Sequence, residues 1–309
     1  MPDRISRRMW LGRSLAVAAA GWPTVITQSD SESDILNAVD QRRRAAGLGP
    51  FQQFESPLYI GTGDAPRSFQ ETALRLCEDL AEDWLGHFGR RGLPAARPMR
   101  RLVVVILADP KRLAAFLSLE PDPELRGLYD LEADWLAICD NRGDGSPRAE
   151  RANSIALHHE ATHQLCFHCG LLEPRADVPL AISEGLAVYG EVRRPGGRTP
   201  VGALNAERLA VLNTAARSGQ TLIPMRRLVV EDRLFADPET RQLAYAQAWL
   251  LIHWLMQQRP RQARLATYLD TLRHRQDASQ RLEDLTAHLG DAELLDADLK
   301  RYANRLLRR

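Results

Sequence analysis

The residues with the clearest chemical meaning are His-Glu-Ala-Thr-His at positions 159–163, inside a segment, 154–169, that has helical spacing. On a helix, His159 and His163 project from the same face, so both imidazoles can reach one Zn²⁺ ion. Glu160, between them, can approach a water molecule bound to that ion and act as a general base. These residues predict one zinc ion with a hydrolytic role.

A second pattern supplies the third protein ligand that a zinc hydrolase needs. Ile-Ser-Glu-Gly-Leu-Ala-Val-Tyr at positions 182–189 has helical spacing and follows the histidine pattern closely along the chain. Its carboxylate, Glu184, completes a set of two histidines and one glutamate. The rival pattern, in which a third histidine follows on the same segment, is excluded because residues 167–172 place no histidine at the required distance.

Together, these two patterns resemble the motifs of the gluzincin metallopeptidases, in particular an uncharacterised bacterial branch of domain-of-unknown-function proteins. The resemblance runs from about Pro57 to the C-terminus. It implies His159, His163 and Glu184 as zinc ligands and Glu160 as the general base. It also implies a mixed α/β piece before the zinc helix and a helical lobe after it.

The resemblance includes Tyr-Ala-Gln-Ala-Trp at positions 245–249, where some gluzincins carry a tyrosine that stabilises the tetrahedral oxyanion. It therefore implies a catalytic role for Tyr245, whose alternative is an aromatic position in the core or at the rim. His253, two helical turns further on, is another candidate for that role. Glu191, seven residues beyond Glu184, can orient a ligand histidine by a hydrogen bond, or it is a surface carboxylate.

The predicted function is zinc-dependent hydrolysis of peptide bonds, in which metal-bound water attacks the carbonyl and Glu160 accepts the proton. The resemblance implies that a peptide or protein substrate binds in extended form along an edge strand, for which residues 135–139 are the candidate. The alternative is a catalytically inactive peptide-binding or scaffold protein of the cell envelope that retains the fold. Glu160 favours catalysis, because a purely structural metal site needs no general base.

The elements that must position these residues divide the chain into a mixed first part and a helical second part. Strand patterns occur at 57–63, 101–108 and 135–139, and helical patterns at 35–46, 69–88 and 111–119. After residue 151, every long segment has helical spacing. The predicted fold class is α+β: a small mixed α/β N-terminal lobe with the zinc helix, followed by an all-helical, gluzincin-like C-terminal lobe.

The first residues have the pattern of an export signal. Ser-Arg-Arg-Met-Trp-Leu at positions 6–11 precedes a short apolar run that ends in small residues, and together they resemble a twin-arginine signal. Arg13 interrupts the run, which is too short to span a bilayer. We predict export to the periplasm or another extracytoplasmic space, with no stable membrane span after signal removal. An ordinary secretory signal, a retained anchor and an N-terminus without an address are the alternatives.

The predicted domain organisation follows from these segments. Residues 1–28 form the export signal, 29–54 a linker or leading helix, 55–200 the α/β lobe with the zinc-binding helices, and 201–309 the helical lobe. The 309-residue chain has 41 Lys and Arg against 40 Asp and Glu, a formal net charge of +1. Because nucleic-acid binders usually carry a basic excess, we predict no nucleic-acid partner.

The cysteines permit several interpretations. Cys166 and Cys169 form one C-x-x-C pattern, and the second pair that a zinc ribbon requires is missing. A redox motif, a disulfide and a buried apolar role for Cys166 all remain open. With Cys77 and Cys139, four cysteines allow three disulfide pairings.

Overall fold

The computed structural model describes residues 31–122, 125–143, 146–192 and 200–308. The predicted export signal, residues 1–28, lies outside these ranges. The chain divides into two compact units, one made of residues 1–82 and 98–165 and the other of 83–97 and 166–309. The predicted domain boundaries remain a prediction.

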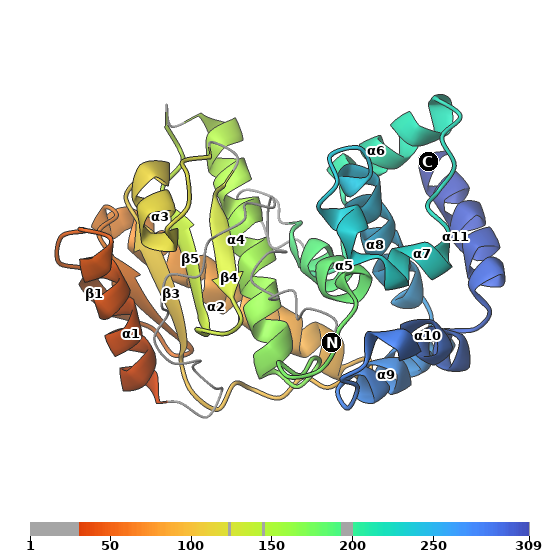
Figure 1. The fold of residues 1–309 in the computed structure, drawn as a ribbon, viewed down its shortest axis with the longest axis horizontal. Coiled ribbons are helices and arrows are strands. Elements are labelled where there is room, and N and C mark those ends of the chain that lie inside the picture. The colour runs from red at the N-terminus through yellow and green to blue at the C-terminus, as the bar shows by residue number, and fades with distance from the viewer. Residues whose placement is uncertain (1–30, 123–124, 144–145, 193–199, 309) are drawn as a thin grey trace. The chain divides into compact units, whose positions relative to one another are not determined.

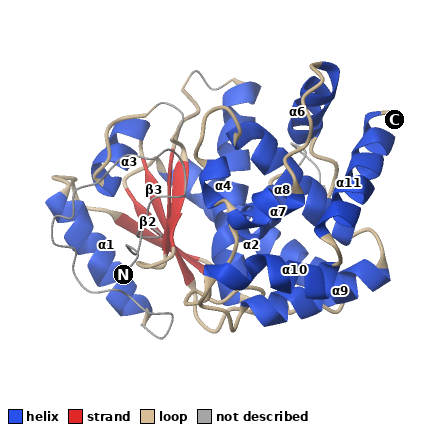
Figure 2. Ribbon diagram, turned by 45° about the vertical axis from the view of Figure 1, so that its right-hand side comes forward, coloured by secondary structure: helices blue, strands red, loops and turns tan. Residues whose placement is uncertain are grey.

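The first unit is built on a five-stranded sheet, drawn in red in Figure 2. Its strands are β1 (Gln52–Glu55), β2 (Tyr59–Gly63), β3 (Leu102–Leu107), β4 (Gly127–Asp130) and β5 (Trp135–Cys139). Their order is β1-β2-β3-β5-β4; β2, β3 and β5 run parallel, and β1 and β4 join the two edges antiparallel. All residues of β2, β3 and β5 are buried, as expected for parallel strands covered on both faces.

Helices α1 (Glu32–Ala45) and α3 (Pro110–Leu117) cover one face of this sheet (Figure 1). Ile35 and Val39 of α1 and Phe116 of α3 share a core cluster with alternate residues of β3 and β5. Helix α2 (Arg67–Gly89) packs closely on β2, since a Cβ atom at Gly61 would lie 3.1 Å from the Leu74 methyl groups. The sheet is thus a layer between helices. Along the chain, β5 leads into helix α4 (Pro147–His168).

One prediction about this sheet is wrong. Residues 135–139 do form a strand, β5, with the expected bounds, but it is an interior strand between β3 and β4. The edge strand on this side is β4, which no sequence pattern predicted. Four residues that begin with glycine and end with aspartate are too short and too mixed to give a strand pattern.

The second unit is helical in its described residues. After α5 (Leu180–Gly190) come α6 (Ala206–Arg217), α7 (Met225–Val230), the 3₁₀ turn η2 (Asp232–Phe235), α8 (Arg241–Leu255), α9 (Arg259–Leu272), η3 (Ala278–Gln280), α10 (Arg281–Leu289) and α11 (Ala292–Leu307). Helix α8 has an unbroken buried run from Ala246 to Leu255. The predicted α+β fold, mixed first and helical afterwards, is confirmed.

Helices α5 and α8 lie in direct backbone contact. A Cβ atom added at Gly185 of α5 would lie 2.6 Å from the Ala248 carbonyl oxygen and 2.8 Å from Ile252 Cγ1 of α8. Only glycine permits this approach, because a side chain there would meet backbone that cannot move aside. The Glu-Gly pair at positions 184–185 therefore fixes how closely the two helices pack.

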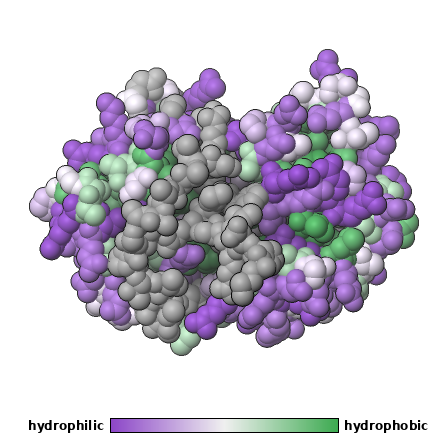
Figure 3. Space-filling model, in the orientation of Figure 1, coloured by the Kyte–Doolittle hydropathy of each residue, from purple (hydrophilic) through white to green (hydrophobic). Residues whose placement is uncertain are grey.

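The exposed surface and the four cysteines bear on the predictions about membrane spans and redox chemistry. On the face shown in Figure 3, hydrophilic side chains predominate, and exposed large apolar side chains include Met99, Val230 and Leu294. Among the described residues, no helix has the length and apolar character needed to cross a membrane. All four cysteines are buried and outside disulfides. Burial raises the pKa of Cys169 to about 11, which disfavours the reactive thiolate of a redox motif.

Candidate metal centre

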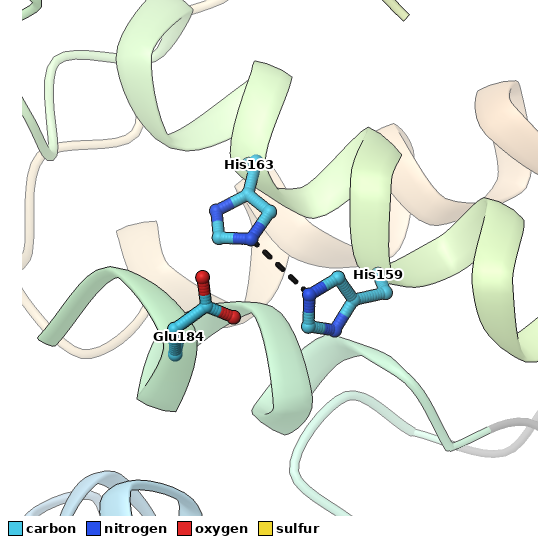
Figure 4. A group of neighbouring side chains, drawn as sticks. All are labelled: His159, His163 and Glu184. Carbon is cyan, nitrogen blue, oxygen red and sulfur yellow. Dashed lines mark hydrogen bonds between the residues drawn. The ribbon is translucent and has the colours of Figure 1, made fainter. Parts of the chain in front are cut away.

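The two histidines of the first motif lie one turn apart on α4, and the glutamate of the second motif lies on α5 (Figure 4). One ligand atom from each of His159, His163 and Glu184 falls within 4.8 Å of the others. The two imidazole Nε2 atoms are 3.2 Å apart. The structure thus brings together all three predicted ligands in a group that could hold a metal ion.

Burial shapes the electrostatics of this group. The Glu184 side chain is 0% exposed and His163 is 3% exposed, whereas His159 is partly exposed. Placing a carboxylate in such surroundings is costly, and a bound cation offsets that cost through charge attraction and direct ligation.

Glu160 is held by the edge strand of the sheet. Its Oε2 accepts a hydrogen bond from the backbone N–H of Tyr129, on β4, at 2.8 Å. In an antiparallel pair, alternate residues turn their backbone groups toward the neighbouring strand. The N–H of Cys139 donates to the carbonyl of Arg126, so Gly127 and Tyr129 turn theirs to the open edge. The predicted general base therefore binds an outward-facing amide of β4.

A glycine allows β4 to lie directly against this side chain. A Cβ atom at Gly127 would be 3.2 Å from Glu160 Cγ, 3.0 Å from Ile138 Cγ2 and 3.1 Å from the Ala137 carbonyl oxygen. These distances are shorter than ordinary van der Waals contact. Strand β4 and Glu160 are consequently packed without space for a larger residue at position 127.

The far end of Tyr129 anchors β4 in the unit. Its hydroxyl donates a hydrogen bond to Asp134 Oδ1 at 2.9 Å, and the other carboxylate oxygen of Asp134 pairs with Arg100. Asp134 and the Tyr129 ring are both 1% exposed. No side-chain pattern could reveal Tyr129, because its contribution to the site is a backbone amide.

The two other predicted site residues, Glu191 and Tyr245, both contact Arg208. Glu191, buried after the end of α5, accepts hydrogen bonds from Asn205 at 3.0 Å and Arg208 at 3.2 Å. The Arg208 guanidinium carbon lies 5.5 Å from the ring centre of Tyr245, which also packs edge-on against Phe235. Arg208 therefore links Glu191 to Tyr245. Their predicted roles toward a ligand histidine and an oxyanion remain predictions.

His253 is part of a buried aromatic cluster. Its Nδ1 lies 2.7 Å from the hydroxyl of Tyr302, and its ring packs on Trp249. Burial lowers the pKa of His253 to about 4, so the imidazole is neutral at physiological pH. These contacts give His253 a packing role in the core of the helical unit.

The comparison with known families covers part of the chain. Residues 153–277 match the model of a family described as a protein of unknown function, DUF1570. The matched region includes both motifs and the Tyr245 segment, and it excludes the sheet. No curated protein matches the chain. The chain is thus similar to this family over the region that carries the candidate metal centre.

Proposed function

We propose that this protein is a zinc-dependent peptidase of the gluzincin type, in which His159, His163 and Glu184 hold one Zn²⁺ and Glu160 is the general base. The observation that carries the proposal is the grouping of two imidazoles and one buried carboxylate within 4.8 Å. Two nitrogens bound to a tetrahedral zinc at about 2.05 Å lie roughly 3.3 Å apart. The separation of 3.2 Å between the two Nε2 atoms agrees with that arrangement.

Each residue then has a defined part in hydrolysis. Zinc bound at this group supplies a Lewis acid and lowers the pKa of a neighbouring water molecule. Glu160 takes the proton from the attacking water and later delivers it to the leaving amine. Because Oε2 of Glu160 accepts the Tyr129 amide, Oε1 is the oxygen assigned to the proton. The phenol of Tyr245 stabilises the oxyanion, and Glu191 orients a ligand histidine.

The substrate in this proposal is an extended peptide that pairs with β4. The backbone groups of Gly127 and Tyr129 face the open edge, as β-strand addition requires. Because the Tyr129 amide bonds Glu160, the substrate pairs with the remaining outward groups of β4. A peptide bound there lies beside the general base.

Export completes the proposal. The pattern in residues 1–28 is assigned to the twin-arginine route, which carries proteins in the folded state. A folded passenger can take up its metal before export, so the protein would arrive outside the cytoplasm with zinc in place.

Zinc stoichiometry tests the assignment of the ligands. We expect one zinc per chain, by elemental analysis, in the wild type and in Glu160→Gln, and loss of zinc in His159→Ala and Glu184→Ala. Asp284→Asn, which removes a buried carboxylate that pairs with Arg275, should keep its zinc. Absence of zinc from reconstituted wild type would refute the proposal.

A peptide library then tests catalysis. We expect cleavage by the wild type and loss of at least about 100-fold in rate with Glu160→Gln, the magnitude typical of removing a general base. Zinc binding with no cleavage of any library peptide would instead favour the inactive peptide-binding protein.

A further inference from the structure

Helix α5, which carries Glu184, is capped at its start by a residue from a distant part of the chain. Its N-cap residue is Pro179, which provides no side-chain cap. The N–H of Leu180, the first residue of the helix, instead donates to Oδ1 of Asp232 at 3.1 Å. Asp232 belongs to η2, about fifty residues further along the chain. A carboxylate at this end satisfies a backbone donor and interacts favourably with the helix dipole.

Arg281, on α10, holds that cap in place. Its guanidinium binds Asp232 Oδ1 through Nη1 at 2.9 Å. It also forms a bidentate salt bridge with Asp177, in which Nε lies 2.6 Å from Oδ2 and Nη2 lies 2.8 Å from Oδ1. The Arg281 side chain is 7% exposed. One buried guanidinium therefore joins the residue that caps α5 to a residue of the segment that leads into α5.

This arrangement bears on the metal ligand. Glu184 lies four residues after Leu180, about 6 Å along the helix axis. The contact of Gly185 with α8 fixes the separation of the two helices, while the cap and Arg281 hold the start of α5. A functional side chain has to be held to about 0.5 Å of its working position. A shift at the start of α5 would therefore displace Glu184 from the position that metal binding requires.

We infer that Arg281 and Asp232 are positioning residues for Glu184, and that they hold α5 in the register that the metal site needs. The inference rests on the proposed function, since it assumes that Glu184 is a ligand. Partners that orient metal ligands typically contribute about 10–100-fold to metal affinity. In this proposal, both residues act through the backbone of α5.

The chain provides a matched control. Helix α7 also begins after a proline N-cap, Pro224, and the N–H of its first residue, Met225, donates to Asp296 Oδ1 at 2.8 Å. Asp296 is a carboxylate from another helix, α11. Asp296→Ala therefore removes the same kind of cap from a helix that carries no predicted site residue.

The experiment measures zinc affinity by competition with a chelator and the visible absorption of the Co²⁺-substituted protein, with circular dichroism to check folding. We expect Asp232→Ala and Arg281→Met to bind zinc about 10–100-fold more weakly and to change the Co²⁺ spectrum. Asp232→Asn, which keeps an oxygen to accept the Leu180 N–H, should recover most of the affinity. Asp296→Ala should lower stability and leave zinc affinity unchanged.

The outcomes separate the two proposals. Wild-type zinc affinity in folded Asp232→Ala overturns the positioning role and leaves the zinc site intact. An equal loss of affinity in Asp296→Ala also overturns it, because general destabilisation would then explain the effect. If Arg281→Met does not fold, the comparison of Asp232→Ala with Asp232→Asn decides the question. A wild type that binds no zinc refutes the proposed function, and with it this inference.

Discussion

At the scale of single residues, the packing of Gly127 against Glu160 leaves no space for a larger side chain at position 127. A methyl group at position 127 would press on Glu160 Cγ, Ile138 Cγ2 and a backbone carbonyl at 3.0–3.2 Å. Relief requires movement of β4 or of the Glu160 side chain. Either movement disturbs the hydrogen bond between the Tyr129 amide and Glu160.

We therefore predict that Gly127→Ala impairs catalysis more than zinc binding. Misplacement of a catalytic group by about 1 Å can cost about 100-fold in rate, and overpacking costs about 1–3 kcal/mol in stability. The measurements are kcat/KM, zinc content and urea unfolding. Gly49→Ala is the control, because position 49 has open space and an ordinary backbone conformation. Full activity in Gly127→Ala would contradict the tight packing of β4 on Glu160.

Sequence patterns predicted the residues whose roles depend on spacing within one helix. The His-x-x-x-His spacing places two imidazoles on one face of any helix, and the structure brings them within 3.2 Å. Tyr129 could not be found in this way, because it contributes a backbone N–H from a strand 31 residues away from Glu160. Arg208, the link between Glu191 and Tyr245, was also missed, since an arginine on a polar helix gives no signal of its own.

At the scale of elements, the contact between α5 and α8 should be intolerant of any side chain at position 185. Alanine normally stabilises a helix relative to glycine by about 1 kcal/mol. Here a Cβ atom would lie 2.6 Å from the Ala248 carbonyl oxygen, which is backbone and cannot turn away. The packing penalty therefore outweighs the gain in helix propensity.

We predict that Gly185→Ala destabilises the protein by about 1–3 kcal/mol and weakens zinc binding through the adjacent Glu184. Gly86→Ala is the matched helical control. Its nearest neighbour is the flexible Arg90 side chain at 3.0 Å, so this variant should be neutral or up to about 1 kcal/mol more stable. Denaturant unfolding and chelator competition measure both effects. Equal stability of the two variants would show that α5 can move away from α8.

The long strands and helices were predicted from the sequence and the short edge strands were not, for a physical reason. Long apolar runs fixed β3 and β5, and helical spacing indicated α2, α4, α5 and α8. The edge strands β1 and β4 have four residues each, and their pairing with a neighbour, rather than their composition, makes them strands. The prediction of β5 as an edge strand came from the resemblance to gluzincins, and the short β4 gave no sequence pattern that could have corrected it.

At the scale of the whole molecule, two buried histidines should make stability depend on pH. Burial, with the nearby charges of Arg91 and Arg90, lowers the pKa of His87 to about 3, and burial lowers that of His253 to about 4. Unfolded, both return to about 6.5. The unfolded chain thus binds protons below pH 6.5 that the folded protein does not, so stability is complete above pH 6.5 and falls with pH toward 4.

We expect the free energy of unfolding to fall by about 2 kcal/mol per histidine between pH 7.5 and pH 5. The measurement is urea unfolding at a series of pH values. Replacing His253 with phenylalanine should remove its share of the slope. A stability that does not change across this range would contradict the burial of both imidazoles in the neutral form.

The cap on α5 also has a consequence for when, during synthesis, the candidate metal centre is completed. Synthesis delivers both histidines and Glu184 well before Asp232, and Asp232 well before Arg281. A growing chain that stops in the middle of α9 would contain every proposed metal ligand and still lack the arginine that holds the cap of α5 in place. Because such long-range contacts form late in folding, the last step in building the centre would wait for the C-terminal helices. A full-length chain would then bind the proposed zinc ion more tightly than a chain truncated before Arg281.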